Sequence, residues 1–298
     1  MSNSSTTTKK WAPVHSGEVL MEDFIKGPRE RMLRGGEVSI AVTDFGGDGP
    51  PLLLLHGLAG SSRELLPTAA ALAESFRVVL MDQRGHGLST RRPDDLSRAA
   101  YVDDVVRVTQ ELEPNQRWTL VGQSMGAHTA FLAASARPDL VAGLVMLEGH
   151  AAGSDDPYEA GRLGRYFASW PVPFSDKEQA RDFLGDDAIV DAWVADLVPT
   201  PDGLVPPFDA DIMERAIAAV HEPRWEQWEA LELPTLVVFA ADGMFSRESR
   251  DELIRRRPTV DRADLTGGSH DAHLDAFDEW ATVLRGWLGR STGGSTSP

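Results

Sequence analysis

Residues 122–126 read Gly-Gln-Ser-Met-Gly, and this pattern is suited to covalent catalysis by Ser124. An apolar run, 118–121, leads into the pattern, and a helix-like stretch follows it. A Gly-x-Ser-x-Gly sequence between a strand and a helix forms a nucleophile elbow, a sharp turn that holds the serine hydroxyl clear of the backbone. Gly122 and Gly126 suit the tight turn because they carry no side chain. The sequence therefore predicts Ser124 as a nucleophile.

A serine hydroxyl is a weak nucleophile at neutral pH, so Ser124 needs a neighbouring base. His270 is the best candidate, because it follows the strand-like run 260–265 in a Gly-Gly-Ser turn. The remaining histidines are assigned structural roles or carry no motif: His15, His56, His86, His128, His150, His221 and His273.

The order of these motifs resembles that of the α/β-hydrolase superfamily, over about residues 36–288. His56-Gly57 follows the apolar run 51–55, and Asp82-Gln-Arg-Gly-His-Gly-Leu-Ser89 follows the run 76–81. The serine turn comes next, and the sequence Gly-Gly-Ser-His-Asp-Ala-His-Leu at 267–274 looks like the family's histidine loop. The resemblance implies that Ser124 and His270 belong to a catalytic triad.

The acid of that triad has two candidates, and here the chain departs from the commonest family pattern. Relatives usually place an aspartate after the strand 234–239, where this chain has Gly243, with Asp242 one residue early. Other relatives place the acid at the end of the preceding strand, where this chain has Glu148. A buried glutamate needs a partner for its charge, and an imidazolium would supply one. We expect Glu148, with Asp242 as the alternative.

The resemblance also implies an oxyanion hole made of two backbone N–H groups, those of Leu58 and Met125. Met125 begins a helix, and the partial positive charge of a helix N-terminus favours an oxyanion. Asp82 and Arg84 are expected to brace the loops beside the serine turn rather than to take part in chemistry.

Strand-like runs alternate with segments whose apolar residues recur at helical spacing, which predicts an α/β fold. Because the strands read as continuous apolar runs, the sheet should be mostly parallel and covered by helices on both faces. The predicted strands are 37–45, 51–55, 76–81, 118–121, 142–147, 234–240 and 260–265; the predicted helices are 61–74, 101–113, 125–136, 247–256 and 273–287. The four motifs then lie at the carboxyl ends of strands, where ligands bind in such sheets.

Residues 149–233 break this rhythm and contain no convincing strand. Helical pieces are predicted near 156–170, 176–184, 187–197 and 209–220, which resembles the helical cap of family members. Ten of the chain's aromatic residues lie here, and together they suggest an apolar pocket wall: Tyr158, Tyr166, Phe167, Trp170, Phe174, Phe183, Trp193, Phe208, Trp225 and Trp228.

The expected organisation is an α/β-hydrolase core at 36–148 and 234–290, with the helical cap inserted at 149–233. Residues 1–35 form an N-terminal tail with an extra helix over 17–33, and residues 291–298 have the composition of a disordered tail.

Composition limits the classes of partner. The formal net charge of −17 argues against nucleic acid or an anionic membrane, and the 298 residues contain no cysteine. No apolar run is long enough to span a bilayer and no secretory signal is visible, so a cytoplasmic location is expected. No phosphate-binding or metal-binding motif is present, so no cofactor and no metal are expected.

These observations predict a serine hydrolase that cleaves a carboxylic ester or lactone of an apolar small molecule through an acyl-enzyme. Two alternatives share the fold: a carbon–carbon bond hydrolase with the same triad, and a non-catalytic small-molecule receptor. The substrate and the oligomeric state stay open.

Overall fold

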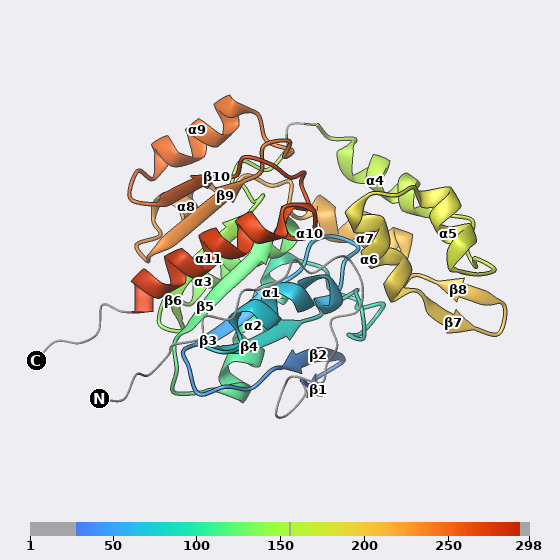
Figure 1. The fold of residues 1–298 in the computed structure, drawn as a ribbon, viewed down its shortest axis with the longest axis horizontal. Coiled ribbons are helices and arrows are strands. Elements are labelled where there is room, and N and C mark those ends of the chain that lie inside the picture. The colour runs from blue at the N-terminus through green and yellow to red at the C-terminus, as the bar shows by residue number, and fades with distance from the viewer. Residues whose placement is uncertain (1–27, 155, 293–298) are drawn as a thin grey trace, which may run out of the picture.

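The computed structural model describes residues 28–154 and 156–292, which fold around one eight-stranded sheet (Figure 1). The sheet order is β1-β2-β4-β3-β5-β6-β9-β10. Its strands are β1 (Arg29–Gly35), β2 (Val38–Asp44), β3 (Pro51–Leu55), β4 (Arg77–Met81), β5 (Trp118–Gln123), β6 (Val141–Leu147), β9 (Thr235–Phe239) and β10 (Asp261–Asp264). Strands β3, β4, β5, β6, β9 and β10 pair in parallel, whereas β1 and β2 are antiparallel, so the predicted mostly parallel sheet is confirmed.

The central strands are buried along their whole length, as their apolar runs predicted. Helices α1 (Leu66–Leu72) and α11 (Phe277–Thr292) pack on one face of the sheet. Helices α2 (Arg98–Leu112), α3 (Met125–Ala136), α8 (Trp225–Glu229) and α9 (Arg247–Arg256) pack on the other. Two short helical pieces complete the core, η2 (Ser62–Leu65) and α10 (Ala272–Asp275). The carboxyl ends of the parallel strands therefore meet at one edge of a rigid three-layer core.

A mostly helical segment lies between β6 and β9, on the side of the sheet where the parallel strands end (Figure 1). It contains α4 (Glu159–Ala168), α5 (Lys177–Leu184), α6 (Ala188–Asp196), α7 (Ala210–Ala218) and a small hairpin of β7 (Val198–Thr200) and β8 (Gly203–Val205). A separate apolar cluster holds this segment together and reaches Ala59 and Met125 in the core. The helices thus rest directly on the loops that carry the serine and oxyanion motifs.

Eight of the ten aromatic residues of this segment fall into three groups, and the other two, Tyr158 and Phe183, are exposed. Trp170, Phe174 and Phe208 are buried within its own apolar cluster. Trp228 is buried against the sheet core, with Trp225 beside it. Tyr166, Phe167 and Trp193 line the cavity described below.

The sequence predictions were wrong in three places. Residues 29–33, predicted as part of an extra helix, form strand β1, because they pair residue by residue with β2. Residues 17–27 lie outside the described part of the chain. The hairpin β7–β8 was missed, since its strands have only three residues each. Helix α11 continues to Thr292, so the first two residues of the predicted C-terminal tail are helical.

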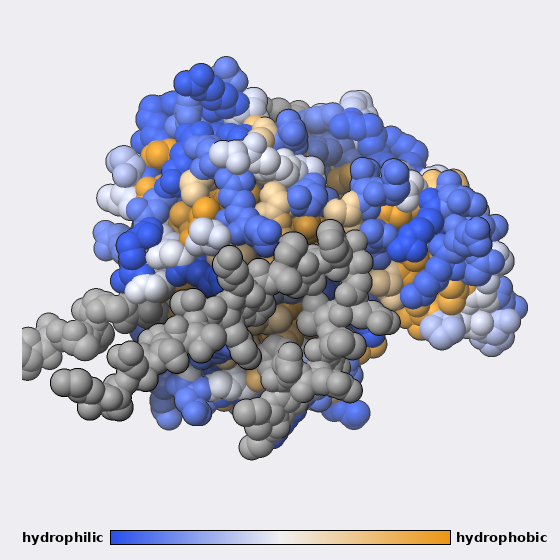
Figure 2. Space-filling view, viewed as in Figure 1, coloured by the Kyte–Doolittle hydropathy of each residue, from blue (hydrophilic) through white to orange (hydrophobic). Residues whose placement is uncertain are grey.

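Hydrophilic side chains cover most of the visible body of the molecule in Figure 2, in keeping with its net charge of −17. No helix of residues 28–154 and 156–292 is long and apolar enough to cross a membrane.

Candidate active site

Ser124 lies at the sharp turn between β5 and α3, and its backbone is strained there, with φ of 52°. The flanking glycines are required by packing. A side chain on Gly122 would overlap the backbone of Gly126, and one on Gly126 would overlap the carbonyl groups of Leu55 and His56. The turn predicted from the pentapeptide is therefore present, and it brings the first turn of α3 against the end of β3.

Three non-glycine residues of the described chain have a positive φ, and all three lie at this edge of the sheet: Ala59, Ser124 and Glu148. Such backbone conformations cost of order 1–3 kcal/mol each and cluster at functional sites, where the surrounding structure holds them in place. They follow β3, β5 and β6 respectively. The strain is therefore concentrated at the strand ends where the predicted catalytic groups lie.

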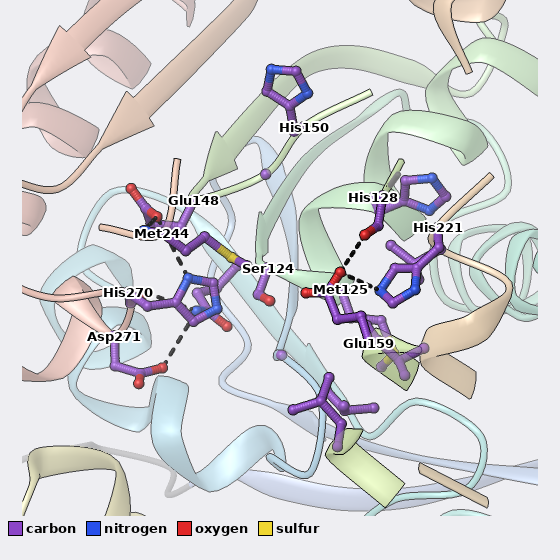
Figure 3. Close-up of a pocket in the computed structure, with 18 of the residues that line it drawn as sticks. Ser124, Met125, His128, Glu148, His150, Glu159, His221, Met244, His270 and Asp271 are labelled. Carbon is purple, nitrogen blue, oxygen red and sulfur yellow. Dashed lines mark hydrogen bonds and ion pairs between the residues drawn. The ribbon is translucent and has the colours of Figure 1, made fainter. Parts of the chain in front are cut away.

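A cavity of about 330 Å³ opens at the same edge, between the core and the helical segment. Ser124, His270 and Glu148 line it together, as do Leu58 and Met125. Figure 3 shows the side chain of Ser124 beside the imidazole of His270, with Glu148 on the opposite side of that ring. The volume of this cavity is in the range of small-molecule binding sites.

The carboxylate of Glu148 lies beside the imidazole of His270. Its Oε2 lies 3.5 Å from His270 Nδ1, and the Glu148 side chain is fully buried. The carboxylate accepts backbone N–H groups from Ala240 (2.8 Å) and Met244 (2.9 Å). These two hydrogen bonds fix the position of the Glu148 carboxylate beside the imidazole of His270.

Asp242, the alternative acid, is exposed and contributes its backbone instead. Its N–H donates to the carbonyl of Gly268 at 3.0 Å, and it forms a β-bridge with Ser269. These contacts fix the loop that presents His270. The neighbouring Gly243 packs against Glu148 so closely that any side chain there would overlap the carboxylate. The position used by most relatives is thus filled by the carboxylate that reaches across from β6.

The predicted oxyanion donors lie beside Ser124. Within the described residues, the backbone N–H groups of Leu58 and Met125 donate to no acceptor. Gln123 joins the two loops of the site: its side chain contacts Gly57 and donates to the carbonyl of His270 at 3.0 Å. Both N–H groups are therefore free to receive a ligand oxygen.

The bracing roles predicted for the other motif residues agree with their contacts. Asp82 accepts the backbone N–H groups of Ser62 (2.7 Å) and Leu88 (2.8 Å), and Arg84 pairs with Asp104 at 2.6 Å. His56 Nε2 accepts the N–H of Gln83 at 3.0 Å, and burial lowers the pKa of His56 to about 4. These groups hold the loops without facing the cavity.

Several cavity residues were not predicted as site residues. Glu64 is buried beside the oxyanion loop, where it accepts the N–H of Gly57 at 3.2 Å, and burial raises its pKa well above the ordinary value. His128, His221 and Glu159 line the side of the cavity away from His270 (Figure 3), and His150 lines it as well. A signal for His128 was present, since it lies one helical turn after Ser124 on the same helix.

No group of three or more metal-ligating side chains occurs in the part of the chain that the structure describes.

Comparison with known proteins gives concordant results. The family model described as "alpha/beta hydrolase fold" matches residues 50–277. The chain is 33% identical over 113 residues to a 2-(acetamidomethylene)succinate hydrolase of Mesorhizobium japonicum, covering 38% of this chain and 40% of that protein. It is 25% identical over 247 residues to the esterase YbfF of Escherichia coli, covering 80% of this chain and 92% of that one. The chain thus spans less than half the length of the first of these relatives.

Among solved structures, that of an E-2-(acetamidomethylene)succinate hydrolase superposes with a TM-score of 0.80 at 22% identity, covering 88% of this chain and 99% of the other. At this identity the likeness concerns the fold.

Proposed function

Because this chain belongs to the α/β-hydrolase family, we propose that it is a serine hydrolase that cleaves a carboxylic ester or lactone of a small molecule through an acyl-enzyme. The observation that carries the proposal is the strained turn at Ser124, which lies in one cavity with His270 and its buried partner Glu148. A serine, a base and an acid in this arrangement serve acyl transfer on several unrelated folds.

In the proposed reaction, the Oγ of Ser124 attacks the substrate carbonyl while His270 accepts the hydroxyl proton. The carbonyl oxygen becomes an oxyanion, which the N–H groups of Leu58 and Met125 bind. His270 then donates the proton to the leaving alkoxide as the carbon–oxygen bond breaks. Water, activated by His270, attacks the acyl-enzyme, releases the acid and restores Ser124.

Glu148 is the proposed triad acid. Its distance to His270 Nδ1, 3.5 Å, is that of an ion pair, and the contact should shorten when the ring becomes positively charged. The exposure of Asp242 and the absence of a side chain at Gly243 support this choice.

The names of the relatives include several kinds of hydrolase, and esterases are among them. A similar chain from Escherichia coli is named an esterase, and it covers most of this sequence. Tyr166, Phe167 and Trp193 add an apolar wall, so we propose a substrate with an apolar portion.

The test is hydrolysis of a panel of 4-nitrophenyl esters and lactones by the wild-type protein and by Ser124→Ala. The alanine variant should lose at least about 10⁴-fold in kcat, because the nucleophile is gone, while its unfolding transition stays close to that of the wild type. Equal turnover by both proteins would contradict the proposal. Binding of apolar ligands without turnover by the wild type would instead favour a receptor.

A further inference from the structure

The cavity extends past Ser124 on the side away from His270. Figure 3 shows His128 and His221 there, with Ser124 and Met125 between them and His270. His128 lies four residues after Ser124 on α3, which is about 6 Å along the helix axis, and its side chain leans back toward the helix N-terminus. A group bound at His128 would therefore lie close to a carbonyl held at Ser124.

His128 lacks the hydrogen bonds that a buried histidine requires. Its side chain is 2% exposed, and neither ring nitrogen has a partner in residues 28–154 and 156–292. Buried polar side-chain atoms are nearly always hydrogen-bonded, because an unsatisfied one costs about 1–3 kcal/mol. Since His128 also lines the cavity, its partner is expected to be a ligand.

The charged groups around His128 are basic. Burial lowers the pKa of His128 well below its ordinary value, and Arg98, Arg224 and His221 lower it further. Arg98 is the most unusual of them. It is 4% exposed and donates Nη2 to the Thr129 hydroxyl, but within the described chain Nε and Nη1 have no acceptor and no carboxylate pairs with it.

Acidic groups offset only part of this charge. Glu159 Oε2 lies 3.7 Å from His221 Nε2 and accepts the Ser154 hydroxyl, and Glu222 pairs with Arg224 at 2.6 Å. Among the described residues no carboxylate pairs with Arg98 or His128, although the Arg98 guanidinium lies over the Tyr101 ring, 4.3 Å from its centre. A buried charge without a counter-ion is unfavourable, so a positive charge kept there points to an anionic ligand.

We propose that this end of the cavity binds a carboxylate of the substrate, with His128 donating to it and Arg98 supplying the attractive charge. The substrate is then a monoester, or the corresponding lactone, whose acyl part carries a second carboxylate on a short aliphatic spacer. This inference rests on the proposed function, because the spacer is measured from Ser124. It also assigns a local anion site to a chain whose net charge is −17.

The test compares two esters that differ only in charge: 4-nitrophenyl hydrogen glutarate and its neutral methyl ester, 4-nitrophenyl methyl glutarate. The wild type should prefer the charged ester in kcat/KM by about 10- to 100-fold, the range of a charge-assisted hydrogen bond. Arg98→Gln and His128→Phe should each remove most of this preference, so that kcat/KM falls further for the charged ester than for the neutral ester.

Arg257→Gln is the matched control. Arg257 is also a buried arginine beside an aromatic ring, with its guanidinium 5.1 Å from the centre of Trp228. Neither Arg98 nor Arg257 lines the cavity itself, but Arg98 acts on the charge of His128 and Arg257 does not. This variant should keep the preference even if it loses stability. The phenylalanine at position 128 keeps the edge contact to Phe131, so one of the two test variants preserves local packing.

Two outcomes separate this inference from the proposed function. Equal kcat/KM for both esters in the wild type, with both reactions abolished in Ser124→Ala, would overturn the carboxylate site and leave the serine hydrolase standing. If Ser124→Ala remained active, or neither ester reacted, calorimetry of glutarate binding to Ser124→Ala would decide. Binding that disappears when Arg98→Gln is added would support the site, and no binding would overturn it.

Discussion

The carboxyl ends of β6 and β9 are neighbours in the sheet, yet they contribute to the site in different ways. The end of β6 carries Glu148, whose side chain is buried and directed at His270. The end of β9 carries Asp242, which is exposed and binds the His270 loop through its backbone, followed by Gly243, which leaves room for the Glu148 carboxylate. The end of β6 therefore supplies the carboxylate, and the end of β9 supplies the glycine that leaves room for it.

The comparison teaches that the acid of a triad is defined by where its carboxylate reaches and not by which strand bears it. Glu148 adopts a left-handed backbone conformation, with φ of 48°, to direct its side chain across to the neighbouring strand. The cost of this strain is offset by the two N–H groups of Ala240 and Met244 that the carboxylate accepts.

The largest expected effect comes from removing each carboxylate in turn. Glu148→Ala should lower kcat by about 10³- to 10⁴-fold, because His270 loses the group that orients it and stabilises its positive form. Asp242→Ala should stay within about threefold of wild type. Steady-state hydrolysis of a 4-nitrophenyl ester measures both, with denaturant unfolding as the check on folding. A large loss in Asp242→Ala together with an active Glu148→Ala would reverse the assignment.

A smaller effect is expected from filling the space at β9. Gly243→Ala should lower kcat by about 10-fold or more and the free energy of unfolding by about 1–3 kcal/mol, since the new methyl group overlaps the Glu148 carboxylate. Gly267→Ala is the control, because a methyl group there meets no atom within 4 Å. If both variants behaved alike, the close packing of Gly243 and Glu148 would not matter for activity.

The smallest effect distinguishes Glu148 from the other buried glutamate, Glu64. Burial raises the pKa of Glu64, so the folded chain keeps a proton there that the unfolded chain releases, and the stability from this group is lost as pH rises above about 4.3. Glu64→Gln is neutral at every pH. It should match the wild type near pH 4 and exceed it in free energy of unfolding by about 1–3 kcal/mol at pH 8.

Glu148→Gln should change stability in the opposite direction at pH 8, because its amide NH₂ would face a backbone N–H that the carboxylate now accepts. Urea unfolding of both variants at the two pH values measures the contrast. Destabilisation of both at pH 8 would show that Glu64 is held as a charged group.

Much of this arrangement could be predicted from the sequence, because motifs at the ends of apolar runs define strand ends. The turn at Ser124, the loop of His270 and the bracing by Asp82 follow from such local patterns. Strand β1 could not be predicted in this way. Its residues Arg-Glu-Arg-Met-Leu-Arg-Gly favour a helix or a strand about equally, and pairing with β2 decides between them.

Local sequence patterns also could not predict the triad acid or the end of the cavity near His128. The choice between Glu148 and Asp242 depends on the packing of Gly243 against a side chain 95 positions earlier in the chain. Likewise, Arg98 and His128 come from different helices, and only the fold shows that both keep buried nitrogens without an acceptor among the described residues.

The most direct test of the central claim is mass spectrometry of the protein quenched during turnover of 4-nitrophenyl butyrate. The account predicts a burst of 4-nitrophenol and one butyryl group on the peptide that contains Ser124, persisting longer in Glu148→Ala, where water is activated less well. Turnover with no acylated peptide, or with the butyryl group on a residue other than Ser124, would contradict it.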